Sequence, residues 1–294
     1  LAASYILMAE CYLPSIQYNS MGAFSYIEMS GSTTGDISYN SIYDSTITVD
    51  GTSYFDTLSF NSFNDGSSLD LAGADVRYYY YNSHSSSPVH LETSTFIGGV
   101  QYNKCECASS IYFIDSSFGG SLLGNCLGSD CHITGAQVII TADIYGNNLQ
   151  SYAYMNLTNI NLTDGISNNE INSGSYLIIN NTNGYGVKEN DLSSHSSIYC
   201  VVAEFNLIDR NAIEAGGQIS ILFGSIQNIE YNVISSNSIV NIDSAVSQNF
   251  NDNSVGGASY ITPNDGVYAC NFRNNSYTVP RLRSEEHTSE LQSL

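Results

Sequence analysis

An octapeptide that recurs in the last third of the chain decides the fold: NLIDRNAI (206–213), NVISSNSI (232–239), QNFNDNSV (248–255) and CNFRNNSY (270–277). Its third position is Ile or Phe, its sixth is always Asn, and its eighth is Ile, Val or Tyr. The seventh residue is small in every copy, and successive copies begin 26, 16 and 22 residues apart. A short unit repeated at such intervals indicates a repeat architecture.

The remainder of the sequence favours strands. Short apolar runs alternate with clusters of Ser, Asn, Asp and Gly, as in STITVD (45–50), VRYYYY (76–81) and QVIITADI (137–144). No segment has a convincing helical periodicity. We therefore predict an all-β fold, a single-stranded right-handed parallel β-helix (β-solenoid) of roughly ten irregular coils with 16–26 residues each.

The repeated asparagines are expected at a corner of each coil, because Asn tolerates left-handed backbone conformations. Their side-chain amides can bond to one another along the stack, so we predict a structural ladder of Asn211, Asn237, Asn253 and Asn275. Like charges could not stack in such rows at close range. The ladder architecture therefore accounts for a charged fraction of only 12%.

The charge balance excludes several functions. The chain has 7 Lys and Arg against 28 Asp and Glu, a formal net charge of −21. So few basic residues cannot build a nucleic-acid-binding face, and the acidity disfavours anionic glycans. No apolar run is long enough to form a transmembrane segment. The composition, rich in hydroxyl and amide side chains, indicates an extracellular or cell-surface protein.

The chain is expected to have three parts. Residues 1–54 match the repeat poorly and would form an N-terminal cap or irregular first coils, and residues 55–282 would form the β-helix. Residues 283–294 are interpreted as a non-native tail, because RSEEHTSELQS (283–293) resembles the translation of a common sequencing-library adapter. The sequence is accordingly interpreted as a metagenomic fragment of a longer protein.

Two short motifs add a family resemblance. Phe250-x-x-Asn253 and Phe272-x-x-Asn275 match a Phe-x-x-Asn motif, and GGQI (216–219) and GGAS (256–259) are degenerate forms of Gly-Gly-Ala-(Ile/Leu/Val). The pattern resembles the repeats of polymorphic outer membrane proteins and of related right-handed β-helix surface proteins. The resemblance implies adhesion or surface display without catalysis.

Cysteines and sequons supply candidate covalent sites. Four of the seven cysteines cluster, and disulfides stapling an irregular insertion at 102–132 are favoured over zinc ligands (with His132 adjacent) or buried thiols. The disulfide candidates are Cys105, Cys107, Cys126 and Cys131. Asparagines in Asn-x-Ser/Thr sequons are candidates for glycosylation, namely Asn156, Asn161, Asn180 and Asn274.

One segment could carry catalysis. Parallel β-helices host lyases and glycoside hydrolases, which need paired carboxylates or a base with bound calcium. The best candidates for such a site are Asp70, Asp75, Arg77 and His84. The competing interpretation is a tyrosine-rich strand flanked by acidic turns. No calcium-loop, nucleotide or nucleophile motif occurs, so we predict no metal site and no cofactor.

These observations lead to a functional prediction. The chain is expected to be a secreted or surface-displayed β-helix passenger with a structural or adhesive role, binding glycans or cell-surface proteins of a host or neighbouring cell. The alternative is a carbohydrate-active β-helix enzyme, a lyase or glycoside hydrolase, acting on a neutral glycan. A third alternative, an ice-binding solenoid, would need a flat, regular Thr or Asn face, and the variable spacing of the repeat argues against it.

Overall fold

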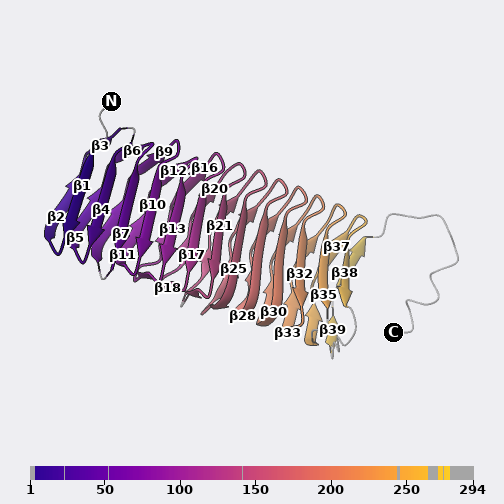
Figure 1. The fold of residues 1–294 in the computed structure, drawn as a ribbon. Coiled ribbons are helices and arrows are strands. Elements are labelled where there is room, and N and C mark those ends of the chain that lie inside the picture. The colour runs from indigo at the N-terminus through magenta and orange to yellow at the C-terminus, as the bar shows by residue number, and fades with distance from the viewer. Residues whose placement is uncertain are drawn as a thin grey trace, which may run out of the picture.

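The protein is a parallel β-solenoid that runs from the N-terminus at one end to the C-terminus at the other (Figure 1). The computed structural model describes residues 4–22, 24–51, 53–140, 142–243, 246–263, 271–273 and 275–278. No helix occurs in these ranges, so the prediction of an all-β parallel solenoid is confirmed.

Each coil contributes strands to three faces. The first face consists of β1 (Tyr5–Ala9), β4 (Tyr26–Ser30), β7 (Thr46–Asp50), β10 (Ser68–Ala72), β13 (Pro88–Glu92), β17 (Ser110–Ile114), β21 (His132–Ala136), β25 (Tyr154–Asn161), β28 (Tyr176–Lys188), β30 (Ser197–Asp209), β32 (Gln218–Leu222), β35 (Ile239–Asp243) and β38 (Tyr260–Pro263). Strands β28 and β30 continue around the corner into the second face.

The second face joins the first in one 27-stranded sheet. Its further strands are β2 (Tyr12–Gln17), β5 (Thr33–Ser38), β8 (Tyr54–Ser59), β11 (Asp75–Tyr80), β14 (Thr95–Phe96), β15 (Val100–Gln101), β18 (Ser117–Phe118), β19 (Leu122–Leu123), β22 (Ile139–Ile140), β23 (Ile144–Tyr145), β26 (Gly165–Ser167), β33 (Ser225–Glu230), β36 (Val246–Asn251) and β39 (Asn271–Arg273).

The third face is a separate 13-stranded sheet with one short strand from each coil. Its members are β3 (Ser20–Met21), β6 (Ser41–Tyr43), β9 (Ser62–Asn64), β12 (Ser83–Ser85), β16 (Lys104–Glu106), β20 (Cys126–Leu127), β24 (Asn148–Leu149), β27 (Glu170–Ile171), β29 (Asp191–Leu192), β31 (Ala212–Ile213), β34 (Val233–Ile234), β37 (Ser254–Gly256) and β40 (Ser276–Thr278).

The core consists of apolar rows that run along the solenoid. Successive side chains of a strand point to opposite faces, so alternate residues enter the interior. On β7, for example, Ile47 and Val49 are buried and lie in register with Leu69 and Leu71 of the next coil. Each buried side chain therefore packs on its counterpart one coil away.

Small polar residues form the corners between faces. At the corner after the third face, Ser67 Oγ donates to the carbonyl oxygens of Ile42 and Asn64 at 3.0 and 2.6 Å. At the corner after the first face, the backbone N–H of Ser32 donates to Ser53 Oγ at 3.2 Å. These hydroxyls satisfy backbone groups that the turns would otherwise leave buried and unpaired.

The coils are more regular than the sequence suggested. Equivalent asparagines at the corner between the second and third faces lie 21 or 22 residues apart instead of 16 to 26. Residues 5–50, expected to form a cap or irregular coils, pair in the same register as the later coils, with Ile6 opposite Ile27 and Ile27 opposite Ile47. The expected non-native tail, residues 283–294, lies outside the described residues.

Candidate binding surface

An asparagine ladder holds the corner between the second and third faces. In each rung the Asn Nδ2 and backbone N–H both donate to the Oδ1 of the Asn one coil further on, for example from Asn103 to Asn125 at 3.2 and 3.1 Å. A second Nδ2 bond runs backwards, from Asn125 to the Val100 carbonyl oxygen at 3.0 Å. The ladder comprises Asn19, Asn40, Asn61, Asn82, Asn103, Asn125, Asn147, Asn169, Asn190, Asn211, Asn232, Asn253 and Asn275.

Three of the four asparagines predicted for a ladder lie in this row, and the fourth does not. Asn232 stands between Asn211 and Asn253, whereas Asn237 lies on the following turn with a φ of 65°. The correct second octapeptide is QNIEYNVI (227–234). Its seventh residue, Val233, is 48% exposed, so the small residue required there by the sequence pattern has no structural basis.

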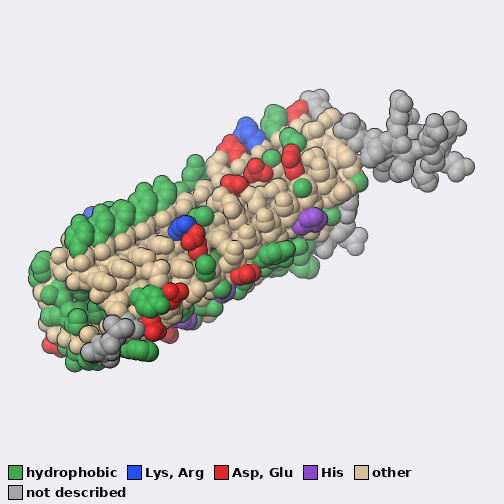
Figure 2. Space-filling view, turned by 90° about the horizontal axis from the view of Figure 1, so that it is seen from above, with side chains coloured by type: hydrophobic (Ala, Val, Ile, Leu, Met, Phe, Trp, Pro, Cys, Tyr) green, Lys and Arg blue, Asp and Glu red, His purple; other side chains and the backbone are tan. Residues whose placement is uncertain are grey.

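An aromatic ladder runs along the outside of the same corner. The residue before each of the first five ladder asparagines is aromatic, and the rings stack at centroid distances of 4.9 to 5.1 Å with interplanar angles of at most 12°. The ladder consists of Tyr18, Tyr39, Phe60, Tyr81 and Tyr102, all at least 41% exposed. Figure 2 shows hydrophobic side chains in a continuous line along one edge of the N-terminal half.

The aromatic ladder ends at a glycine. Gly124 occupies the next position of the row, and a Cβ there would lie 2.6 Å from Tyr102 Cδ1. The ring of Tyr102 therefore lies directly over the backbone of the following coil. Sequence reasoning missed this ladder, although an aromatic-Asn dipeptide at intervals of 21 residues is visible from Tyr18-Asn19 to Tyr102-Asn103.

Beyond Gly146 the same outer row carries mostly polar and charged residues. Arg210 Nη1 lies 3.7 Å from Glu189 Oε1 and 2.6 Å from Asp209 Oδ2, and its guanidinium stands 5.7 Å from the centroid of the Tyr231 ring. Burial raises the pKa of Asp209 from its ordinary value, and Arg210 opposes this shift. The C-terminal half of the edge thus carries an ion-pair cluster centred on the exposed Arg210.

His84, proposed above as a catalytic residue, is a core residue. It lies two residues after the ladder residue Asn82, is 0% exposed, and stacks on Phe63 at a centroid distance of 5.0 Å. Its Nε2 is 2.8 Å from the hydroxyl of the buried Tyr79. Burial lowers the pKa of His84 to about 3, so the imidazole is neutral at physiological pH and sealed from any substrate.

The other three residues of that weak catalytic alternative are on the outside. Arg77 pairs with Asp56 at 3.1 Å, with both side chains more than 40% exposed. Asp70 is half-buried on β10 of the first face, and Asp75 is exposed at the start of β11 on the second. The structure therefore does not bring Asp70, Asp75, Arg77 and His84 together around a common point.

The clustered cysteines lie in regular coils and are free thiols. Cys105 occupies the same core row as His84 and is paired in register with Leu127. Cys131 is buried at the corner after the third face, which Ser67 occupies in an earlier coil, whereas Cys107 and Cys126 are exposed. The irregular insertion expected at 102–132 is thus absent. Burial raises the pKa of Cys105 well above its usual range, which makes this thiol unreactive.

The remaining predicted sites differ in accessibility. Asn161 is exposed at the end of β25, whereas Asn156 and Asn180 are half-buried on strands of the first face. Asn274 lies outside the described residues. In the described ranges no group of three or more His, Cys, Asp and Glu side chains could hold a metal ion. No helix in that part of the chain has the length and apolar character to cross a membrane.

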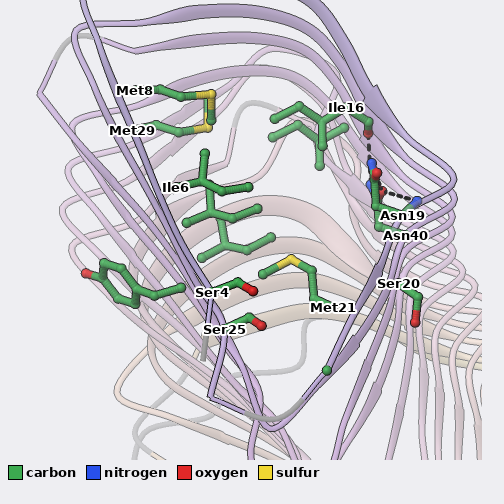
Figure 3. Close-up of a pocket in the computed structure, with 15 residues that line it drawn as sticks. Ser4, Ile6, Met8, Ile16, Asn19, Ser20, Met21, Ser25, Met29 and Asn40 are labelled. Carbon is green, nitrogen blue, oxygen red and sulfur yellow. Dashed lines mark hydrogen bonds between the residues drawn. The ribbon is translucent and has the colours of Figure 1, made fainter. Parts of the chain in front are cut away.

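A hollow of about 460 Å³ is the N-terminal mouth of the core. Figure 3 shows Ile6, Met8 and Met21 pointing into the space enclosed by the first coil. These side chains continue the core rows, since Met8 is in register with the buried Met29. None of the described residues that line the space is charged. It is therefore the open end of the core and not a constellation of converging polar groups.

Comparison with known proteins does not assign a family. No family profile and no curated protein matches the chain. A crystal structure of a TibA fragment hyper-glycosylated by TibC aligns with a TM-score of 0.26 and 14% identity, covering 95% of this chain and 97% of that one. The PL6-family alginate lyase AlyGC aligns with a TM-score of 0.18 and 8% identity, covering 94% and 78%.

Alignments this weak carry no argument about function. The resemblance of the Phe-x-x-Asn motifs to polymorphic outer membrane protein repeats accordingly stays a prediction from sequence. The function must be argued from the surface of this chain.

Proposed function

We propose that the chain is a structural or adhesive passenger: a rigid β-solenoid, secreted or displayed at the cell surface, that binds a partner and catalyses no reaction. The observation that carries this proposal is the exposed aromatic ladder from Tyr18 to Tyr102. A monomeric protein rarely exposes so many large apolar side chains in one contiguous row, and such patches commonly mark interaction sites.

The rigidity of the rod supports the same role. Each residue of the aromatic ladder directly precedes an asparagine of the asparagine ladder, which holds the backbone at this corner. The rings are therefore fixed before a partner arrives. Preorganised side chains lose little conformational entropy on binding. Partners of this kind of surface are glycans or proteins on a host or neighbouring cell.

The residues named for the alternative, a carbohydrate-active enzyme, do not lie together in one site. His84 is sealed in the core at 0% exposure, and Arg77 is outside, paired with Asp56. General acid–base catalysis requires its groups within hydrogen-bonding reach of one substrate atom. The separation of these side chains therefore favours binding without turnover.

A bead-adhesion assay tests the proposal. Beads coated with the full chain should adhere to fixed cells or to polysaccharide-coated surfaces under flow, and no reducing sugar should accumulate. A triple variant Tyr39→Asn, Phe60→Asn, Tyr81→Asn should lose adhesion, because it removes three rings of the aromatic ladder. Asn is the replacement because Asn168 has the same backbone conformation at the same position of a later coil. The matched control Arg210→Asn, Tyr231→Asn alters the C-terminal half of the row. Beads that never adhere, or sugar release by the native chain, would contradict the proposal.

A further inference from the structure

A second aromatic feature adjoins the C-terminal end of the aromatic ladder. A surface hollow of about 260 Å³ is lined by Tyr78, Tyr80, Tyr81, Tyr102 and Gln101. Pockets for drug-sized ligands span about 300–1,000 Å³, so this one is sized for a single ring. Three of its tyrosines are between 41% and 48% exposed, which leaves the hollow open to solvent.

The orientation of Tyr80 distinguishes the hollow from the aromatic ladder. The ring of Tyr80 is turned by 82° relative to Tyr78 and by 78° relative to Tyr81. Both faces of Tyr81 are occupied by the rings of Phe60 and Tyr102, so it presents an edge to Tyr80. A ligand in the hollow therefore meets aromatic groups set at right angles to one another, not a flat stack.

Two glycines support the walls. A Cβ at Gly98 would lie 2.6 Å from Tyr78 Cδ1, and a Cβ at Gly124 would lie 2.6 Å from Tyr102 Cδ1. Gly98 does not have a positive φ, so its backbone does not require glycine. The absence of a side chain there instead lets the ring of Tyr78 lie against the next coil. The two outer walls are thus seated on the chain and not free in solvent.

The polar groups of the hollow are neutral. Gln101 Nε2 donates to the Gly98 carbonyl oxygen at 2.6 Å, which fixes the amide, and amide oxygens accept hydrogen bonds. The four phenol groups can both donate and accept. Among the described residues no charged side chain lines the hollow; the guanidinium of Arg77 lies 5.2 Å from the centroid of the Tyr78 ring and is paired with Asp56. This combination of aromatic carbon with uncharged hydroxyl and amide groups suits a ligand with an apolar ring face and many hydroxyls.

We propose that this hollow is a subsite for one pyranose ring of a neutral glycan. The inference rests on the proposed adhesive function and names its ligand class and site. An anionic glycan is disfavoured, because Arg77, which lies over the Tyr78 ring, is already paired with Asp56, and the chain carries a net charge of −21. A purely apolar partner would leave the hydroxyl groups and the Gln101 amide without matching partners.

Calorimetric titration of the full chain tests the subsite. The probes are mannohexaose, cellohexaose and xylohexaose, with trigalacturonate as the anionic comparison. At least one neutral hexasaccharide should bind. Tyr80→Ala and Gln101→Ala should each weaken that binding by about tenfold, since 1.4 kcal/mol corresponds to one decade in Kd. Tyr80→Phe keeps the ring and should weaken it less.

Matched controls separate the hollow from tyrosine in general. Tyr145 is exposed in the same strand row as Tyr80 and Gln101, two coils beyond Gln101, and Tyr231 holds the position of Tyr81 in a later coil. Tyr145→Ala and Tyr231→Ala should bind the hexasaccharide as the native chain does. Circular dichroism of each variant confirms that the solenoid is intact.

The possible failures are distinguishable. If a hexasaccharide binds equally well to Tyr80→Ala and Gln101→Ala, the subsite is wrong while adhesion stands. If no neutral glycan binds although coated beads adhere, the ligand class is wrong. Equal binding of trigalacturonate overturns the charge argument. Self-association that Tyr80→Ala abolishes, seen by analytical ultracentrifugation without glycan binding, would make the surface an interface between copies. If the beads do not adhere either, the proposed function itself fails.

Discussion

The two halves of the solenoid share one inner row and differ in the outer row beside it. Inside, the asparagine ladder is continuous from Asn19 to Asn275. Outside, the preceding position is aromatic in the first five coils and mostly polar or charged in the later ones. The later residues are Asn168, Glu189, Arg210, Tyr231 and Asp252.

The backbone of that outer position is nevertheless the same in both halves. The φ of the aromatic residues is 52° to 57°, and that of the five later residues is 51° to 56°. Left-handed backbone costs a residue with a Cβ about 1–2 kcal/mol, so a strong constraint must hold it there. The buried Asn that follows supplies this constraint. The fold is therefore encoded inside the corner, and the outer residue is free to serve a partner.

Removing a ladder asparagine should have the largest effect, and the effect should be equal in the two halves. Asn125→Ala leaves two donors of Asn103 and the Val100 carbonyl oxygen without their partner. The expected loss is about 3–5 kcal/mol in the free energy of unfolding, measured by denaturant titration. Asn211→Ala should cost the same, although its outer neighbour is the charged Arg210 and that of Asn125 is Gly124.

The control for this comparison is Asn206→Ala. Asn206 is exposed on the outer face of β30, so its loss should change the free energy of unfolding by less than about 0.5 kcal/mol. A small cost for Asn211→Ala together with a large one for Asn125→Ala would mean that only the N-terminal half depends on the ladder.

Acid should weaken the N-terminal half selectively. The residue two positions after a ladder Asn is buried in the core. In the N-terminal half this row includes His84, whereas in the C-terminal half it includes Ile213 and Ile234. The folded-state pKa of His84, about 3, lies below the ordinary 6.5, so between these values the unfolded chain binds a proton that the folded chain does not. This contribution to stability is intact above pH 6.5 and falls by up to about 1.4 kcal/mol per pH unit as the pH drops toward 3.

His84→Phe should remove this part of the pH dependence. The variant loses some stability at every pH, because the Tyr79 hydroxyl is left without its partner. Between pH 7 and pH 4, however, its free energy of unfolding should decline less steeply than that of the native chain. Cys105→Val, in the same core row, should keep the native slope. Parallel slopes for the native chain and His84→Phe would refute the assignment.

The outer rows should differ in strength and in their response to salt. Phe60→Ala breaks stacks with both Tyr39 and Tyr81 and should cost about 1–3 kcal/mol. Arg210→Ala breaks an exposed pair with Glu189 and a pair with the largely buried Asp209, and should cost about 1 kcal/mol. In 1 M salt the cost of Arg210→Ala should shrink, while that of Phe60→Ala persists. Thermal unfolding of both variants at low and high salt provides the measurement.

The boundary between the halves should show effects smaller than the loss of a ladder asparagine. Gly124 and Gly146 both have a φ of 62°, but only a Cβ at Gly124 meets the Tyr102 ring. Gly146→Ala should cost about 1–2 kcal/mol from its left-handed backbone alone. Gly124→Ala should cost about 1 kcal/mol more, since the ring must move. Identical unfolding midpoints would show that Tyr102 does not depend on the glycine beneath it.

The fold could be predicted from sequence because its determinants recur. An apolar residue three positions before each ladder Asn and another two positions after it, with His84 as the exception, describe coils from Ile16-x-x-Asn19 to Phe272-x-x-Asn275. The requirement for a small seventh residue concealed this rule, and it led to Asn237 in place of Asn232. The seventh position of the octapeptide faces outward, so packing does not restrict the size of the residue there.

The candidate site could be predicted only in part. The row of tyrosines at 78–81 was visible, but alternation alone does not reveal that Tyr79 enters the core while Tyr80 borders a hollow. His84 was misjudged because the core row accepts Phe63, His84 and Cys105 alike. A polar residue in an otherwise apolar row is identified only when its partner, here the Tyr79 hydroxyl, is known.

The uniform rung of the asparagine ladder has a consequence for how such a gene can change. Each coil presents the same acceptor to the coil before it and the same donors to the coil after it, at a spacing of 21 or 22 residues. Deleting or duplicating one coil in frame therefore rejoins matching surfaces. Unequal recombination in steps of 21 or 22 codons can thus lengthen or shorten the rod, and with it the reach of the protein, without a new fold having to arise.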